Sequence, residues 1–118
     1  MELRRLFARL LAGAALGVAA VGGVGHSARA EDNTFVLTLQ DHKFSTTRLE
    51  LPAGVKIKLI VRNLDKTPEE FESVKLNREK VIPGGGEIVV FLGPLSSGTY
   101  DFFGEFHRET ATGEIVVK

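Results

Sequence analysis

The fold of this chain is decided by the stretch Tyr100-Asp101-Phe102-Phe103-Gly104-Glu105-Phe106-His107, which is followed by Gly113 and a last short apolar run. Residues 99–103 and 114–117 are predicted to form two strands, because both runs are rich in β-branched and aromatic residues. Successive side chains of a strand face opposite sides, so either Phe102 or Phe103 belongs to the core. The loop between the two strands, residues 104–113, carries Glu105, His107 and Glu109.

The rest of the chain from residue 35 onward has the same β pattern. Phe35, Leu37 and Leu39 alternate with other residues, and residues 55–62 alternate over their whole length, which is the period of a half-buried strand. Turns rich in Gly, Pro, Asn and Asp separate these runs from three further predicted strands at 48–51, 71–76 and 87–92. About seven to eight short strands at this spacing predict an all-β sandwich.

Residues 1–30 are predicted to be a signal peptide. Arg4, Arg5 and Arg9 precede an apolar run over residues 10–25, and Ala28-Arg29-Ala30 is a small-x-small cleavage sequence. A transmembrane helix needs about 20 strongly apolar residues, and this glycine-rich run is shorter. We therefore expect a single domain over residues 31–118, exported to the periplasm without stable membrane insertion, and the paired arginines also fit the twin-arginine route.

The charge of the predicted mature domain excludes some partners. Removing residues 1–30 takes away four arginines and one glutamate, which leaves 88 residues with 11 basic and 14 acidic side chains and a net charge of −3. A slightly acidic domain without a basic stripe argues against binding to nucleic acid or to an anionic membrane. The chain has no cysteine, so its stability comes from packing or partly from a bound metal.

Acidic and imidazole side chains gather in two loops that should meet at one end of the sandwich. The loop from 63 to 72 carries three glutamates, the loop from 104 to 113 carries Glu105 and His107, and His42 follows the first strand. Carboxylates with one or two imidazoles suit Fe(II), Fe(III), Cu(II), Mn(II) or Zn(II) rather than Cu(I). The candidate metal ligands are therefore Glu69, Glu70, Glu72, Glu105, His107 and His42, and catalytic residues are unknown.

Each of these residues also has a structural interpretation. The three glutamates can form a solvated face, and strand alternation places Glu69 on the side of Phe71 but Glu70 and Glu72 on the other. All three therefore cannot face one ion without a distorted backbone. His107 can be a hydrogen-bonded loop residue, and His42 can be a solvated turn residue.

The chain resembles the cupredoxin superfamily over nearly all of residues 35–118, and the resemblance implies a Greek-key β-sandwich. The sequence Val61-Arg62-Asn63, followed by Pro68-Glu69-Glu70-Phe71, is similar to the loop that carries the first copper histidine. The resemblance places Glu69, or as a second choice Glu70, at that histidine and His107 at the second one. It also places Gly104 at the cysteine, and Ala111 or Thr112 near the axial methionine. Blue copper electron transfer of the usual kind is therefore not expected, because the Cu–thiolate bond defines that site.

A longer combination carries a more specific resemblance: Asn-Leu-Asp-Lys-Thr-Pro-Glu-Glu-Phe-Glu-Ser from residue 63, Lys-Val-Ile-Pro from residue 80 and the stretch 100–107. It is similar to the EfeO-type cupredoxin-like domain, and especially to the stand-alone periplasmic cupredoxin of bacterial Ftr-type iron uptake systems. The resemblance implies three partners: a periplasmic copper- and iron-binding protein, an inner-membrane iron permease and a membrane ferredoxin-like protein. It also implies a part in ferrous iron oxidation and in delivery of the ferric product to the permease.

The leading hypothesis is a periplasmic metal-binding protein for iron uptake, with iron or Cu(II) held by Glu69, Glu105 and His107. In this hypothesis Glu70, Glu72 and His42 lie in or next to the ligand set, and whether the protein itself oxidises iron is left open. Two alternatives stand beside it. One is a metal-free protein-interaction module with Phe103 and Phe106 on its docking face, and the other is a type-2 copper-binding protein for copper handling.

Overall fold

A computed structural model describes residues 33–118, which form a compact unit of their own, Asn33–Lys118. The predicted signal peptide lies outside the described residues. Within them, nine strands and one short 3₁₀ segment build the structure, and no helix is long and apolar enough to cross a membrane. The all-β prediction is therefore confirmed for this part of the chain.

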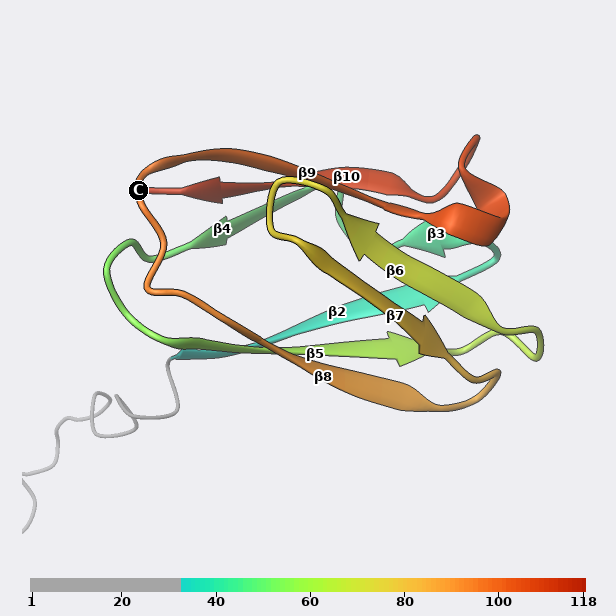
Figure 1. Cartoon of the computed structure of the whole chain (residues 1–118). Coiled ribbons are helices and arrows are strands. Elements are labelled where there is room, and N and C mark those ends of the chain that lie inside the picture. Colours follow the sequence, from blue (N-terminus) through green and yellow to red (C-terminus); the bar gives the residue numbers. More distant parts are fainter. Residues whose placement is uncertain (1–32) are drawn as a thin grey trace, which may run out of the picture. The chain divides into compact units, whose positions relative to one another are not determined.

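The strands form two sheets that pack face to face as a sandwich (Figure 1). One sheet has the order β3-β2-β5-β8, and its strands are β2 (Thr34–Gln40), β3 (Lys43–Phe44), β5 (Ile57–Asn63) and β8 (Glu87–Leu92). The other has the order β4-β10-β9-β6-β7, and its strands are β4 (Arg48–Leu51), β6 (Glu69–Ser73), β7 (Arg78–Ile82), β9 (Gly98–Gly104) and β10 (Thr112–Val117). The pairs β2–β5 and β4–β10 are parallel, and the other neighbours are antiparallel.

Alternating side chains of the two inner faces make the core. In β5, Leu59 and Val61 are fully buried while Lys58 and Arg62 are exposed, as the period of two requires. The rings of Phe44 and Phe102 meet edge to face with centroids 5.0 Å apart, and Phe71 lies 5.6 Å from Phe102. Phe102 is thus the core member of the Phe102–Phe103 pair.

Two of the nine strands were not predicted from the sequence. The strand β3 has two residues, too few to show a period. Four of the five residues of β7 are exposed, because β7 lies at the edge of its sheet and buries only Ile82. Without alternation between buried and exposed residues, the pattern that identifies a half-buried strand is missing.

Three connections gather at one end of the sandwich: the β2–β3 turn, the β5–β6 loop and the segment after β9, which includes η2 (Glu105–His107). In Figure 1 the β2–β3 turn and η2 lie at the same end of the molecule. Hydrogen bonds join the connections, from Thr110 Oγ1 to the carbonyl oxygen of His42 at 2.6 Å and from the amide of Phe106 to Glu69 Oε2 at 2.8 Å. The expectation that the two ligand-bearing loops meet is confirmed.

Candidate metal centre

Glu69, the first residue of β6, is fully buried and lies at the centre of the gathered loops. Its Oε1 atom lies 2.6 Å from Nδ1 of His107, and its Oε2 atom accepts hydrogen bonds from the amides of Phe106 at 2.8 Å and Glu70 at 3.1 Å. A buried carboxylate is tolerated only when such partners replace its hydration. Glu69 therefore links β6 to η2 and fixes the position of the imidazole.

The same carboxylate fills the space next to Gly104. A Cβ atom added at Gly104 would lie 2.6 Å from Cδ of Glu69 and 2.9 Å from Cβ of Ala111, far inside contact distance. A cysteine at this position would require Glu69 to move. Together with the absence of cysteine from the whole chain, this packing shows that a blue copper centre with a Cu–thiolate bond does not fit here.

His42 and His107 stack on each other, with ring centroids 3.5 Å apart and planes inclined by 11°. A metal ion bound to an imidazole nitrogen lies near the plane of that ring. Because the two planes are nearly parallel and separated, one ion cannot lie in both. The stack therefore supports the position of His107, but in this arrangement the two histidines do not bind the same ion.

The turn that carries His42 is held from two sides. Asp41 and His42 have the left-handed φ angles 55° and 59°, which are uncommon for residues other than glycine. The carboxylate of Asp65 accepts hydrogen bonds from both of their amides, at 2.7 and 2.9 Å, and Thr110 binds the carbonyl oxygen of His42. Burial acts to raise the pKa of Asp65, but these amides and the nearby imidazoles hold it below its ordinary value.

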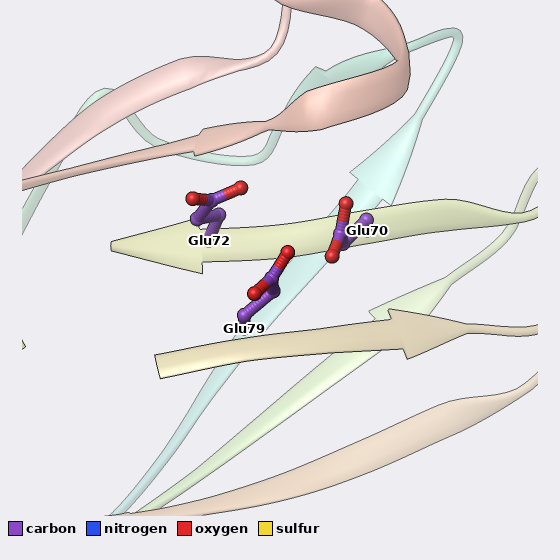
Figure 2. A group of neighbouring side chains, drawn as sticks. All are labelled: Glu70, Glu72 and Glu79. Atoms are coloured by element: carbon purple, nitrogen blue, oxygen red, sulfur yellow. The ribbon is translucent and has the colours of Figure 1, made fainter. Parts of the chain in front are cut away.

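Glu70 and Glu72 lie on the opposite face of β6, as the alternation predicted, and Glu79 of β7 joins them (Figure 2). Within residues 33–118, they are the one group of three or more His, Asp or Glu side chains whose ligand atoms all lie within 4.8 Å of one another. A hydrogen bond to Glu79, burial and repulsion from neighbouring carboxylates raise the pKa of Glu70 to about 7. The like charges are thus close enough to share a proton.

The candidate ligands from the sequence did not include Glu79, and Glu105 lies apart from the contact between Glu69 and His107. Glu79 pairs with Glu72 across the β6–β7 hairpin. If β7 had been predicted, the register of that hairpin would have placed Glu79 beside Glu72. Glu105 forms an ion pair with Arg108 at 3.6 Å, and its charge contributes to the raised pKa of Glu70. Of the expected set Glu69, Glu105 and His107, the structure places only Glu69 and His107 in direct contact.

A surface pocket of about 520 Å³ opens beside the stacked imidazoles. Its lining combines the two rings, an exposed aromatic side chain and polar residues of the β9–β10 connection, and consists of His42, Phe106, His107, Arg108, Glu109 and Thr110. The side chain of His107 is 28% exposed to solvent, whereas that of Glu69 is 1% exposed. The imidazole thus lies between a buried carboxylate and an open surface pocket.

Solved structures with the same fold include several copper proteins. Amicyanin from Paracoccus versutus has a TM-score of 0.59 at 17% identity, covering 73% of this chain and 82% of amicyanin. Auracyanin A, a blue copper protein of Chloroflexus aurantiacus, has a TM-score of 0.61 at 14% identity. The match covers 72% of this chain and 98% of auracyanin A. The metal-binding domain of the Cu(I)-exporting ATPase CopA of Streptococcus pneumoniae has a TM-score of 0.62 at 13% identity. The match covers 72% of this chain and 84% of that domain. At these identities the likeness establishes the fold alone.

One relative is closer in sequence, and a family model matches the chain. An uncharacterised protein of Rickettsia prowazekii is 47% identical over 81 residues, which cover 69% of this chain and 65% of that protein, so the match spans just under two thirds of the relative's length. A family model described as a cupredoxin-like domain matches residues 12–117. Because that model spans nearly the whole chain, this protein belongs to the cupredoxin-like domain family.

Proposed function

We propose that this protein is a periplasmic metal-binding protein that holds Cu(II) or iron at the loop end of the sandwich, with His107 as the central donor. The observation that carries the proposal is the contact between buried Glu69 and His107 at 2.6 Å, beside an open pocket. A carboxylate that orients an imidazole at the edge of a solvent-filled pocket is typical of metal centres with exchangeable positions.

The donor chemistry supports a hard or borderline ion. Nitrogen and oxygen donors without thiolate or thioether suit Cu(II) and iron better than Cu(I). Auracyanin A is named as a copper protein, and this supports copper as one occupant. The donor chemistry, rather than the neighbours, favours Cu(II) over Cu(I). Because no thiolate is available, any electron transfer at this centre would use an ion with nitrogen and oxygen ligands.

The resemblance to EfeO-type domains and to the cupredoxin of Ftr-type systems supports a role in iron uptake. In this role the protein supports ferrous iron oxidation and passes the product toward an inner-membrane permease, with a periplasmic copper- and iron-binding protein as a further partner. Carboxylates favour Fe(III) over Fe(II) by charge, so acidic residues near the bound ion ease oxidation and retain the product. The proposal also requires that the protein can release the bound iron to the permease.

A calorimetric titration of residues 31–118 tests the metal-binding step. Cu(II) and Mn(II), the latter as an air-stable substitute for Fe(II), are titrated into the wild type, His107→Ala and the control Glu114→Gln, which changes an acid on β10. Saturable binding near one equivalent that is lost only in His107→Ala is expected. If the wild type binds neither ion, the proposal is wrong, and a metal-free interaction module with the exposed Phe106 on its surface becomes the better interpretation.

The iron uptake step needs a test in cells. A bacterial strain that lacks this protein is complemented with the wild type or with His107→Ala and grown under iron limitation. Growth should be restored by the wild type alone. Equal restoration of growth by both proteins would show that iron uptake does not need the metal centre. Normal growth of the strain without the protein would favour a copper-handling role.

A further inference from the structure

The two ring nitrogens of His107 are in opposite situations. Nδ1 faces Oε1 of the buried Glu69 at 2.6 Å. An ionised carboxylate only accepts hydrogen bonds, so Nδ1 carries the proton in the neutral ring and Nε2 keeps its lone pair. Because the two nitrogens point away from each other across the ring, Nε2 faces away from Glu69, toward the exposed part of the side chain.

The exposed part of His107 lines the surface pocket described above. An imidazole that donates one N–H to a carboxylate and directs the other nitrogen outward has the arrangement of a metal-bound histidine with its orienting partner. The carboxylate fixes the tautomer and the orientation of the ring. Glu69 accepts three hydrogen bonds, at Oε1 from Nδ1 of His107 and at Oε2 from the amides of Phe106 and Glu70, and these hold it in place as the orienting partner.

The pocket offers one further anionic donor. Glu109 lines it together with His107, and its side chain is exposed and therefore able to reorient without loss of packing. His42 covers one face of the His107 ring and limits its rotation, while its own plane runs parallel to that ring. The stack thus limits the orientations of the His107 ring without placing His42 in the ligand set.

We propose that the ion binds in the outer pocket through Nε2 of His107 and the carboxylate of Glu109, and that Glu69 is a positioning residue rather than a ligand. The ligand class is a borderline divalent cation such as Zn(II), Cu(II) or Fe(II), with water in the remaining coordination positions. This inference rests on the proposed metal-binding function, and it assigns the metal ligands of that function to Nε2 of His107 and the carboxylate of Glu109. Ligation through Nδ1 would instead require the Glu69–His107 hydrogen bond to break.

The tautomer of His107 tests this assignment directly. Long-range ¹H–¹⁵N correlation spectra of residues 31–118 are recorded without metal near pH 8 and then during addition of Zn(II), a diamagnetic probe. The metal-free protein should show a protonated Nδ1 and a bare Nε2 for His107. Zn(II) should shift the Nε2 resonance and leave the Nδ1 proton in place.

Two other outcomes would overturn the assignment in different ways. If Zn(II) removes the Nδ1 proton and shifts Nδ1, the ion binds between His107 and Glu69, so metal binding stands but the outer site is wrong. If the spectrum of His107 does not respond to Zn(II) at all, both the outer site and the proposed role of His107 as the central donor are wrong.

Variants separate the roles of the carboxylates. Glu109→Gln removes a ligand and should weaken Zn(II) binding at least tenfold, whereas Glu105→Gln, a neighbouring acid paired with Arg108, should leave it unchanged. Glu69→Gln keeps an oxygen that accepts the Nδ1 proton, so it should cost on the order of 10- to 100-fold in affinity without abolishing binding. Circular dichroism confirms that each variant folds. Loss of binding in Glu105→Gln with retention in Glu109→Gln would contradict the proposed ligand set.

Discussion

Strand β6 carries carboxylates on both of its faces, and the two faces treat them in opposite ways. On the inner face, Glu69 is buried and each of its oxygens has a hydrogen-bond donor. On the outer face, Glu70 and Glu72 lie beside Glu79 and repel one another (Figure 2). Glu69 and Glu70 are adjacent in the chain, yet the first carboxylate holds the loop end together. The second is repelled by neighbouring carboxylates, which disfavour its ionised form. Burial with matched donors, rather than the number of acids, distinguishes the two faces.

The largest expected effect comes from removing the inner carboxylate. Glu69→Ala leaves two amides and the Nδ1 group of His107 without their acceptor in a buried position, so the free energy of unfolding should fall by about 3 kcal/mol. Glu72→Ala on the outer face should change it by no more than about 0.5 kcal/mol. Urea denaturation of both variants measures the difference, and equal losses would contradict the contrast between the faces.

A side chain at Gly104 should compete with Glu69 for the same space. Gly104→Cys forces its Cβ atom against Glu69 Cδ, and overpacking of this kind costs about 2 kcal/mol. In the double variant Gly104→Cys with Glu69→Ala, that clash is relieved. A double-mutant cycle by urea denaturation should therefore give a loss smaller than the sum of the single losses. Strict additivity would show that Gly104 and Glu69 do not share one space.

The turn that carries His42 should depend on Asp65. Asp65→Ala removes the acceptor of two amides in a left-handed turn, which should lower the free energy of unfolding by about 1.5 kcal/mol. The ring-current shifts that His42 and His107 impose on each other should also shrink in the NMR spectrum. Unchanged shifts in a folded variant would mean that Asp65 does not position the stack.

The smallest effect concerns the outer face and its dependence on pH. The pKa of Glu70 is raised from 4.5 to about 7, so the folded protein holds this proton more tightly than the unfolded chain does. The contribution of Glu70 to the free energy of unfolding therefore decreases as pH rises from about 4.5 to about 7. Glu70→Gln cannot ionise and should be more stable than the wild type at pH 8 but not at pH 4.

Thermal unfolding at these two pH values measures this difference. Glu114→Gln, which changes an acid on β10 outside the Glu70 group, serves as the control. A gain for Glu70→Gln that is the same at both pH values would contradict the shared proton.

The part of the site that follows from strand pleating could be predicted from the sequence. The alternation of β6 separates Glu69 from Glu70 and Glu72, and the strand pattern brings the two ligand-bearing loops to one end. Glu79 could not be found, because β7 is exposed over most of its length and shows no period. The position of His42 depends on a hydrogen bond to Asp65, 23 residues away, and on left-handed backbone angles that no local pattern encodes.

The two faces of β6 offer two places for a bound ion, which are the loop end beside Glu69 and the outer acidic face. Equilibrium titration of residues 31–118 with Cu(II) is compared among the wild type, His107→Ala and the triple variant Glu70→Gln, Glu72→Gln, Glu79→Gln. Binding should be lost in His107→Ala and retained in the triple variant, because the proposed centre lies at the loop end. Retention in His107→Ala with loss in the triple variant would contradict it and place the ion on the outer acidic face.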